Sequence, residues 1–297
     1  MSNAEAVVAR FKREVEDEWR NPVVATAYRT WSREEAEWGR QARELMLKRA
    51  QLAPGMKVLD LGSAHGEPGL AIAETVGPQG QVTLTDLAPA LLEIAAERAR
   101  AAGLTNVMTR VADAHDIPFP AETFDRVSGR FVAMYFADQQ QAFREALRVL
   151  RPGGMAVYLV WGDIDQPMFS EVLGTLFRHV SPPEPVPGAP SPFAFSEPGS
   201  LASALRTAGF EDVEEENATI ETTFPGSPEQ WWGWLADVGA PIQTWMAALP
   251  AADRDRAVAE IHAVIRRYYD GEVVRIPANV HVGWGRKGGR ASRLPAT

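Results

Sequence analysis

The sequence contains no cysteine among its 297 residues. This absence excludes disulfides, thiolate nucleophiles and cysteine-ligated zinc. Long apolar runs are also missing, because none approaches the roughly 18 residues that a membrane-spanning helix needs. Basic residues are in the minority, at 30 against 39 acidic residues, which gives a net charge of -9. Because a protein that binds a polyanion normally carries a basic surplus, we expect no nucleic-acid partner.

The remaining composition is that of an ordinary globular protein, with 45% hydrophobic and 23% charged residues. The length suffices for one large α/β domain with insertions or for two modest domains. The first five residues, Met1 to Glu5, lack a basic region followed by an apolar one, so we expect no secretory signal. These features together predict a soluble cytoplasmic protein without a membrane span.

Strand-like and helix-like segments alternate over residues 57–161. This alternation predicts a parallel, doubly wound sheet. The predicted strands are 57–61, 81–86, 106–111, a strand from 124 to at least 127, and 155–161, and the helices between them are 68–76, 89–102 and 138–150.

The segments outside this core indicate a helical cap. Two helical stretches, 4–19 and 24–51, precede the core, and the chain after residue 162 alternates between irregular, helical and strand-like segments. The later predicted elements are a helix at 196–209, an exposed strand at 211–224 and a final strand at 280–285. We divide the chain into an N-terminal cap (1–51), an α/β core (52–162), a proline-rich lid insertion (163–195), a return to the core (196–226), a helical lid insertion (227–271), and a last strand with a loose tail from 288 (272–297).

The stretch after the first core strand has the features of a ligand-binding loop. The strand ends at Leu61, glycines and small residues follow, and Pro68 suits the first turn of a helix. Backbone N–H groups in such a loop and at the helix N-terminus suit an anion or a polar ligand edge. Asp60, at the end of the strand, suits a cationic ligand better than a phosphate.

Acidic residues stand at the ends of three successive predicted strands, at Asp60, Asp86 and Asp113. In a doubly wound sheet the ligand lies across these carboxyl ends. Asp86, 20 residues after Gly66, is placed to accept hydrogen bonds from ribose hydroxyls. Asp113 is placed to accept one from an exocyclic amine such as that of adenine. Each residue alone also fits an ordinary turn, but their order favours a ligand.

These motifs resemble those of class I S-adenosylmethionine-dependent methyltransferases. The similarity is greatest to the group that includes ubiquinone/menaquinone biosynthesis methyltransferases and natural-product tailoring enzymes. It covers about a third of the chain well, with all motifs in the family's order and spacing. The matching segments are 58–66, 82–86, 111–114, 124–127 and 146–154.

The resemblance implies a seven-stranded, mostly parallel, Rossmann-like sheet with an α-helical cap, and S-adenosyl-L-methionine as the cofactor. It also implies in-line transfer of a methyl group to O, C or N of a small, largely apolar or aromatic molecule. No metal is implied, and the expected partner is the methyl acceptor, with a homodimer left open. The implied cofactor-binding residues are Asp60, Gly62, Ser63, Gly66, Asp86, Leu87, Asp113, Ala114, Arg130 and Tyr28.

Two positions depart from the family pattern. Ala64 stands where glycine is usual, and binding should survive if its backbone is in a region that L-residues allow. His65 stands where a small hydroxyl residue is usual, and it would point near the methyl-transfer centre. If a general base assists, His65 and Tyr135 are the candidates, although His65 also fits a plain loop residue.

Arg130 and the aromatic residues have alternative interpretations. Arg130 suits the cofactor carboxylate, an acidic acceptor, or an ion pair with Asp138. The aromatic side chains fit either a substrate pocket or the packing of the cap on the sheet, and Trp231 and Trp234 share one helical face while Trp232 lies on another. The candidate substrate residues are Trp31, Tyr135, Trp161, Trp231 and Trp234.

Two rival functions are weighed against methyl transfer. A nicotinamide-dependent oxidoreductase predicts glycines at 62, 64 and 67 and no role for Asp113, so Ala64 and Glu67 disfavour it. A cofactor-binding member of the fold repurposed for another reaction or for binding stays open, because this family needs no diagnostic catalytic side chain.

Overall fold

The fold is an α/β sheet with helices around it, seen in a computed structural model that describes residues 3–181, 186 and 188–289. Within these residues the strands form one seven-stranded sheet in the order β3-β2-β1-β4-β5-β7-β6. Neighbours from β3 to β5 pair in parallel and β7 pairs antiparallel with both β5 and β6, which confirms the predicted fold class. The strands are β1 (Lys57–Leu61), β2 (Gln81–Asp86), β3 (Val107–Val111), β4 (Phe124–Arg130), β5 (Leu150–Trp161), β6 (Glu211–Pro225) and β7 (Val273–Arg286).

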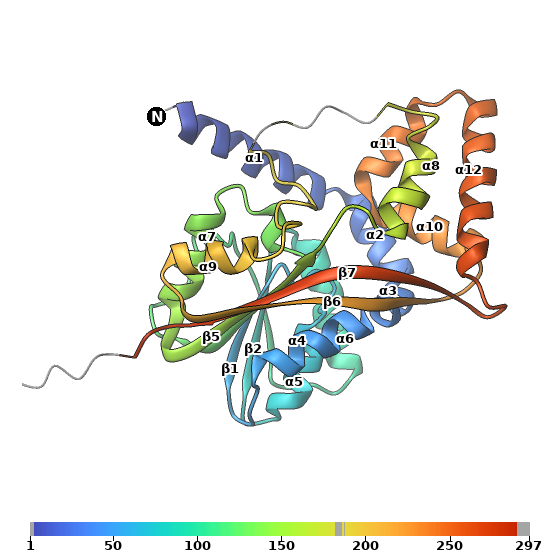
Figure 1. Ribbon diagram of the computed structural model, residues 1–297. Coiled ribbons are helices and arrows are strands. Elements are labelled where there is room, and N and C mark those ends of the chain that lie inside the picture. The colour runs from blue at the N-terminus through green and yellow to red at the C-terminus, as the bar shows by residue number, and fades with distance from the viewer. Residues whose placement is uncertain (1–2, 182–185, 187, 290–297) are drawn as a thin grey trace, which may run out of the picture.

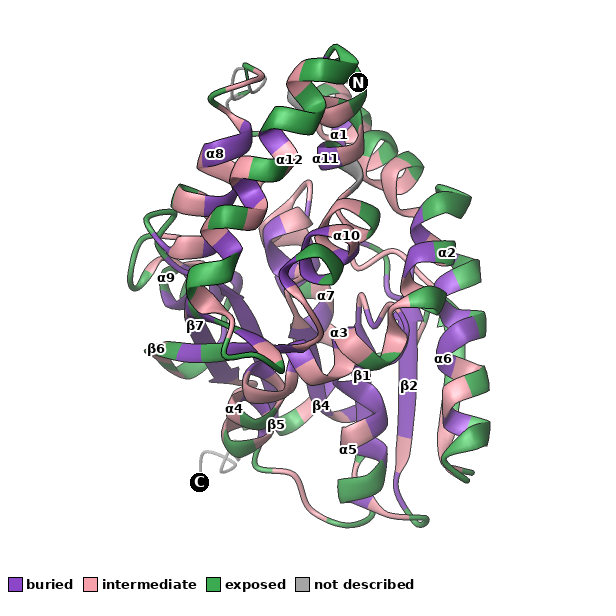
Figure 2. Cartoon of the chain, turned by 90° about the vertical axis from the view of Figure 1, so that its right-hand side faces the viewer, coloured by how far each residue is buried: buried purple, intermediate pink, exposed green. Residues whose placement is uncertain are grey.

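Helices cover both faces of the sheet (Figure 1). Apolar residues of α5 (Gly69–Val76) and α6 (Pro89–Ala101) pack against β1 and β2 in a cluster that includes Val58 and Leu84. On the other face α7 (Gln139–Val149) and α9 (Ser200–Ala208) pack together against β5, β6 and β7. The central strands are therefore buried on both sides, as parallel sheets require, and Figure 2 shows β2 buried along most of its length.

The prediction of one helical stretch over 24–51 is wrong, because the structure divides it into three helices. They are α2 (Pro22–Thr30), α3 (Ser32–Trp38) and α4 (Arg40–Ala50), preceded by α1 (Asn3–Trp19). The first break is at Trp31, with φ -103° and ψ 16°. The second is at Gly39, where a Cβ atom would lie 1.9 Å from Nη1 of Arg130. The breaks turn α3 so that it lies over the sheet.

Three other element boundaries differ from the predictions. The last strand begins at Val273 rather than 280, because its first half pairs with β6 and alternates buried and outward residues. Helix α7 ends at Val149, and β5 begins at Leu150 rather than 155, so the segment 151–154 belongs to the strand. Helix α9 begins at Ser200 rather than 196.

A group of helices forms the cap beside the carboxyl ends of the strands (Figure 1). It contains α10 (Pro228–Val238), α11 (Ala240–Ala248) and α12 (Ala251–Ile265), with the π-helical turn η2 (Met168–Leu173) and α8 (Gly174–Leu176). Trp231, Trp232 and Trp234 are all buried, since α2, α11 and α12 enclose α10. Burial therefore does not single out one face of α10, and a role of Trp231 and Trp234 toward a substrate stays a prediction.

Some predictions fall on residues that are not described. The proline-rich part of the 163–195 insertion includes residues 182–185 and 187, and the predicted tail includes 290–297, all outside the described residues. In the part of the chain that is described, no helix has both the length and the apolar character needed to cross a membrane.

A buried arginine joins the sheet to the N-terminal helices. Arg126 in β4 donates hydrogen bonds to the carbonyl oxygens of Ala50 at 2.7 Å and Gln51 at 2.9 Å, at the C-terminal end of α4. The last carbonyl groups of a helix have no partner within the helix. Arg126 therefore satisfies them and fixes α4 against the sheet.

We predict that Arg126→Met lowers the free energy of unfolding by about 2 kcal/mol, because it leaves buried carbonyl groups without donors. Urea denaturation followed by circular dichroism measures the change. Arg144 lies exposed on α7, and Arg144→Met is the matched control, with an expected change within about 0.5 kcal/mol. Equal losses in the two variants would contradict the capping role.

Candidate active site

The loop after β1 has an unusual backbone with three positive φ values. Gly62, Ala64 and Gly66 have φ values of 59°, 44° and 107°. A Cβ atom at Gly62 would lie 2.3 Å from Val132, and one at Gly66 would lie 2.9 Å from Leu70. Ala64 thus occupies the left-handed region, which L-residues are allowed but adopt only sparsely, so its backbone is strained and not forbidden. The strain is about 1 kcal/mol, and a hydrogen bond from the Ala64 amide to Oδ2 of Asp86, at 2.9 Å, offsets it.

Asp60 is a fully buried carboxyl group beside this loop. Its Oδ1 accepts a hydrogen bond from Oγ of Ser128 at 2.6 Å. Its Oδ2 has no hydrogen-bond partner among the described residues. The nearby Gly69 amide lowers the pKa of Asp60. Burial dominates and raises the pKa of Asp60 to about 7. A cation beside Oδ2 would therefore stabilise the ionised form.

Asp86 ends β2, and its carboxyl group holds two separate backbone segments. Its two oxygens accept hydrogen bonds from the amides of Ala64 and Ala88, each at 2.9 Å. Burial raises the pKa of this carboxyl group, and these amides partly offset the effect. Each carboxylate oxygen can accept a second hydrogen bond, so Asp86 remains able to bind a ligand hydroxyl.

Ser63 and Leu87 frame the same part of the site. The amide and hydroxyl of the buried Ser63 both donate to the carbonyl oxygen of Thr85, at 2.9 and 3.2 Å. Both of its hydrogen-bond donors are therefore engaged within the protein. The carbonyl oxygen of Leu87 accepts a hydrogen bond at 2.9 Å from Nε of Arg20, which follows α1. Their roles toward a cofactor stay predictions.

Asp113 follows β3 and contacts the N-terminal helix. It accepts hydrogen bonds from Nζ of Lys12 in α1 at 3.1 Å, from the His115 amide at 2.9 Å, and from the His115 ring. Burial alone would raise the pKa of Asp113, but the hydrogen bonds from His115 and Lys12 outweigh it and hold the pKa well below its ordinary value. Ala114 beside it is partly buried against the core. Helix α1 therefore closes the site at the end predicted for adenine.

Aromatic rings from the N-terminal helices lie over the loop. The Tyr28 ring lies 5.2 Å from that of His65 and 6.5 Å from that of Trp19, and Trp19 meets Tyr135 edge-on at 5.9 Å. Tyr135 ends the short helix η1 (Ala133–Tyr135) after β4. Burial raises the pKa of both tyrosines, so their phenols stay protonated. We call Trp19, Tyr28 and Tyr135 the aromatic roof.

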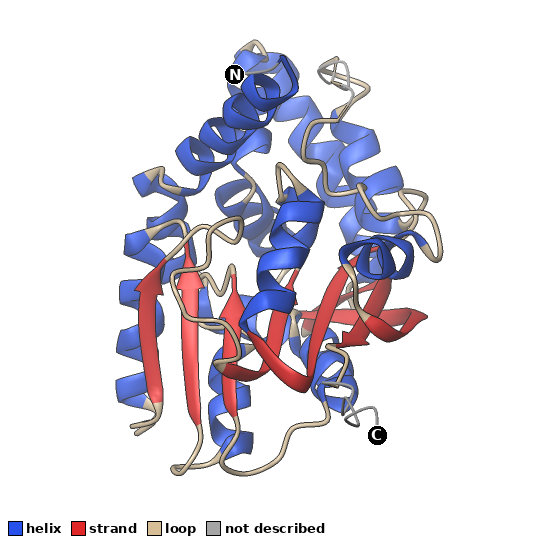
Figure 3. Ribbon diagram, turned by 90° about the vertical axis from the view of Figure 1, so that its left-hand side faces the viewer, coloured by secondary structure: helices blue, strands red, loops and turns tan. Residues whose placement is uncertain are grey.

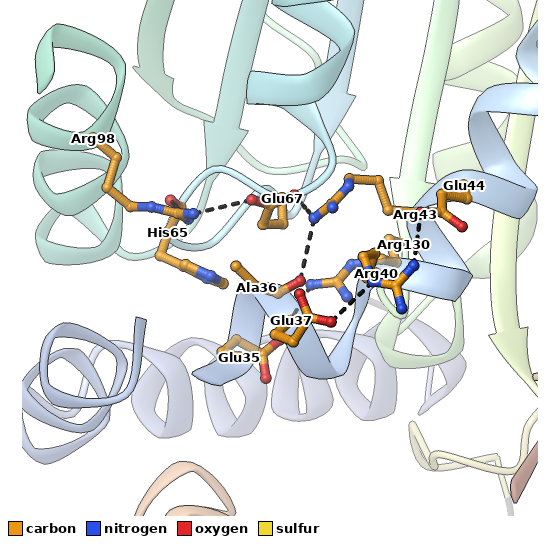
Figure 4. Close-up of polar contacts among 10 residues, drawn as sticks. All are labelled: Glu35, Ala36, Glu37, Arg40, Arg43, Glu44, His65, Glu67, Arg98 and Arg130. Carbon is orange, nitrogen blue, oxygen red and sulfur yellow. Dashed lines mark hydrogen bonds and ion pairs between the residues drawn. The ribbon is translucent and has the colours of Figure 1, made fainter. Parts of the chain in front are cut away.

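His65 lies in the interior as a neutral imidazole. Burial, aided by Arg98 and Arg130, lowers its pKa well below the ordinary value. Neither ring nitrogen has a hydrogen-bond partner among the described residues. Figure 4 shows the ring on the side of the loop that faces α3. A buried polar group without a partner is uncommon and suits a ligand contact.

Arg130 forms a buried ion pair that the sequence did not predict. Its Nη2 lies 3.2 Å from Oε1 of Glu35 in α3, and both side chains are 7% exposed. The alternative pairing with Asp138 is wrong, because Asp138 caps α7 by accepting from the Gln141 amide. Burial raises the pKa of Glu35 to about 6, although Arg130 opposes the shift. Nε of Arg130 has no partner in the described part of the chain, so it remains available to an anionic ligand group.

An aromatic cluster lies next to this pair, over the carboxyl ends of β4 and β5. Phe131 stacks on Trp161 at 4.1 Å, and Trp38 lies 5.8 Å from Trp161 and 5.0 Å from Trp234. Phe131 has φ 53°, a strained conformation of the kind that often occurs at functional sites. We call Trp38, Phe131, Trp161 and Trp234 the aromatic cluster.

The other predicted substrate residues lie farther into the cap. Trp31 donates from Nε1 to Oδ2 of Asp237 at 2.8 Å and packs on Phe224. Trp231 lies 5.7 Å from Trp234. The indole N–H groups of Trp38, Trp231 and Trp234 have no hydrogen-bond partner among the described residues.

Sequence reasoning missed Glu35, Trp38 and Phe131. Glu35 and Trp38 are three residues apart and therefore share a helical face. This spacing was the available signal, but it did not show which part of the core the face would meet. Phe131 follows Arg130 directly, yet its stacking on Trp161 depends on how β4 and β5 pair.

Comparison with known proteins agrees with this arrangement. A family model described as "Methyltransferase domain" matches residues 52–174. Nocamycin O-methyltransferase of Saccharothrix syringae is 31% identical over 235 residues, which cover 75% of this chain and 82% of that protein. The chain belongs to the methyltransferase family. This membership confirms the predicted family and its cofactor, S-adenosylmethionine.

Other relatives match a smaller part or the fold alone. The ubiquinone/menaquinone biosynthesis C-methyltransferase UbiE of Bordetella parapertussis is 39% identical over 120 residues, covering 40% of this chain and 46% of that protein, so the chain spans about half the length of this relative. The phosphoethanolamine N-methyltransferase 2 of Haemonchus contortus, solved with phosphomonomethylethanolamine and S-adenosylhomocysteine, has a TM-score of 0.55 at 20% identity and covers 89% of this chain and 57% of that one. The YcgJ protein of Bacillus subtilis has a TM-score of 0.55 at 19% identity, with 84% and 99% covered.

The residues of this methyltransferase fit its cofactor. The unpartnered Oδ2 of Asp60 suits a nearby cation, and only glycine fits at Gly62 and Gly66, where a Cβ atom would collide with Val132 and Leu70. Asp86 retains acceptor capacity for hydroxyl groups. In Figure 3 the parallel strands end beneath the N-terminal helices.

We predict that Arg130→Met lowers the free energy of unfolding by about 3 kcal/mol at pH 8, because Glu35 is left as an unpaired buried charge. The pKa of Glu35 is already raised to about 6 in the folded protein. Protonation of Glu35 therefore stabilises the folded state. The difference in the free energy of unfolding between the unaltered protein and Arg130→Met should shrink as the pH falls from 8 toward 5.

Urea titrations at several pH values measure this effect, and the double variant Glu35→Gln/Arg130→Met provides the control. The double variant should regain most of the lost free energy of unfolding, and the remaining loss should no longer depend on pH. A deficit that is independent of pH and unchanged in the double variant would contradict the role of the pair.

Proposed function

We propose that this methyltransferase moves a methyl group from S-adenosylmethionine to O, C or N of a small, largely apolar or aromatic molecule. The observation that carries the proposal is the aromatic cluster of Trp38, Phe131, Trp161 and Trp234, whose Phe131 ring lies 5.7 Å from the Arg130 guanidinium. The cofactor supplies an electrophilic methyl group on a sulfonium. An apolar acceptor next to that group needs alignment more than covalent help from the protein.

The chain supplies this alignment by enclosing the site. The aromatic roof covers the loop from the side of α1 and α2, and the contact of Lys12 with Asp113 holds α1 in place. Exclusion of water removes a competing nucleophile and strengthens local electrostatic interactions. The aromatic cluster would hold the plane of an acceptor ring by stacking.

His65 and Tyr135 are the side chains we assign to proton handling. His65 is uncharged with two unpartnered ring nitrogens, so it can accept a proton from an acidic acceptor group. Its lowered pKa makes it a weaker base than a free imidazole, which suits acceptors that lose their proton readily. Tyr135 stays protonated and can donate a hydrogen bond to acceptor oxygen.

The unpartnered indole groups indicate what the acceptor carries. The N–H groups of Trp38, Trp231 and Trp234 are donors without acceptors among the described residues, and buried donors favour a partner strongly. We therefore propose an acceptor with at least one oxygen atom amid apolar or aromatic carbon. We also propose that the protein works in the cytoplasm without nucleic acid, as a monomer or a homodimer, in keeping with its net charge of -9.

Calorimetric titration tests the cofactor site. We predict that S-adenosylmethionine binds in the micromolar range, a typical enzyme–ligand scale, whereas NADH gives no binding. Asp86→Ala should weaken binding by about tenfold or more, because it removes a charged acceptor. The control is Asp125→Ala, since Asp125 also accepts a backbone amide, that of Lys57, but stands at the start of β4. Unchanged affinity in Asp86→Ala would refute the assignment of this residue.

Methyl-transfer assays across phenols, quinones, amines and thiols test the reaction. We predict that Trp161→Ala lowers kcat/KM for an accepted substrate by about tenfold, because it removes a stacking surface worth about 1 kcal/mol or more. Its affinity for S-adenosylmethionine should change by less than about twofold. Cofactor binding without transfer to any compound class would instead favour the repurposed, non-methylating alternative.

A further inference from the structure

A second cleft lies on the far side of α3 from the aromatic cluster. Its volume is about 790 Å³, within the range of pockets that hold small molecules. Arginines dominate the charged lining, and one carboxylate accompanies them. These charged residues are Arg33, Arg40, Arg43, Arg98, Arg275 and Glu37.

The arginines come from separate parts of the chain. Arg33 belongs to α3, Arg40 and Arg43 to α4, Arg98 to α6 and Arg275 to β7. Their convergence is notable because the whole chain carries a net charge of -9. Folding therefore brings five guanidinium groups together at one place, and all but that of Arg33 contact carboxylates.

Two of these guanidinium groups share a single carboxylate. Nη1 of Arg43 and Nη2 of Arg98 each lie 3.0 Å from an oxygen of Glu67, whose side chain is 7% exposed. Figure 4 shows them reaching Glu67 from opposite sides. Glu67 is not part of the cleft lining, and one carboxylate balances only one of the two cations. The shared contact also fixes both guanidinium groups in place before any ligand arrives.

The other arginines are only weakly neutralised. Arg33 is exposed and makes no ion pair within the described part of the chain. Arg40 contacts Glu37 at 2.9 Å and Glu44 at 3.2 Å. Arg275 contacts Asp270 at 3.1 Å and Glu221 at 3.4 Å, with both carboxylates close to half-exposed. Such surface pairs contribute little free energy, so a multiply charged ligand can replace them.

We propose that this cleft binds a phosphorylated small molecule at a site separate from the methyl-transfer site. A phosphate group carries close to two negative charges and three strong acceptor oxygens. The planar guanidinium group of arginine matches such an anion with paired N–H donors. Helix α3 separates the two sites, because Glu35 and Trp38 are buried toward the active site while Arg33, Ala36 and Glu37 line the cleft.

Calorimetric titration of the full chain with inorganic pyrophosphate, at constant ionic strength and with saturating S-adenosylhomocysteine, tests this proposal. Pyrophosphate should bind, and Arg33→Gln should raise its Kd by about fivefold, because one unpaired cation is lost. Glu37→Gln should lower the Kd, because it removes the single carboxylate from the lining. Arg144→Gln, which makes the same change at an exposed arginine of α7, should leave the Kd unchanged.

Three results would overturn the proposal. One is the absence of pyrophosphate binding, another is equal weakening by Arg33→Gln and Arg144→Gln, and the third is binding that saturating S-adenosylhomocysteine abolishes, since the anion would then lie in the cofactor site. The Kd of each variant for S-adenosylmethionine is measured in parallel and should not change. That measurement separates a failure of this site from a failure of the fold or of the proposed methyl transfer.

Discussion

The buried carboxylate of Glu67 holds the loop after β1 to two helices. It accepts hydrogen bonds from Arg43 of α4 and Arg98 of α6, and Arg98 also donates to the carbonyl oxygen of His65 at 2.8 Å. The loop backbone at Ala64 and Gly66 has positive φ values that local preference alone would not favour. Breaking a buried ion pair is strongly destabilising, so this three-residue network fixes the loop against α4 and α6.

Helix α3 depends on the same network and determines what surrounds it. The Ala36 carbonyl oxygen accepts a hydrogen bond from Arg43 at 3.2 Å, and Glu35 pairs with Arg130 below it. One short helix thereby contributes Glu35 and Trp38 to the active-site side, and Arg33 and Glu37 to the arginine-lined cleft. Gly39 follows this helix, and a side chain there would displace the guanidinium group of Arg130.

The sequence was sufficient for those parts of the site that follow directly from strand ends. Asp60 and Asp86 lie where the strand–loop–helix pattern placed them, since their positions depend only on local chain direction in a parallel sheet. Glu35 and Trp38 could not be placed, because continuous helical periodicity through 24–51 concealed the breaks at Trp31 and Gly39. Contacts such as that of Lys12 with Asp113 join residues 101 positions apart, and no local pattern indicates them.

Burial also determines how the site responds to charge. Asp60 has a pKa raised to about 7 because it is buried with one oxygen unpartnered. A cation beside that oxygen favours the ionised carboxyl group and causes it to release a proton, whereas a neutral ligand does not. A cationic ligand beside Asp60 would therefore be favoured over its neutral counterpart. This discrimination needs no diagnostic catalytic side chain, which explains why the cofactor site is easier to read from the sequence than the chemistry beside it.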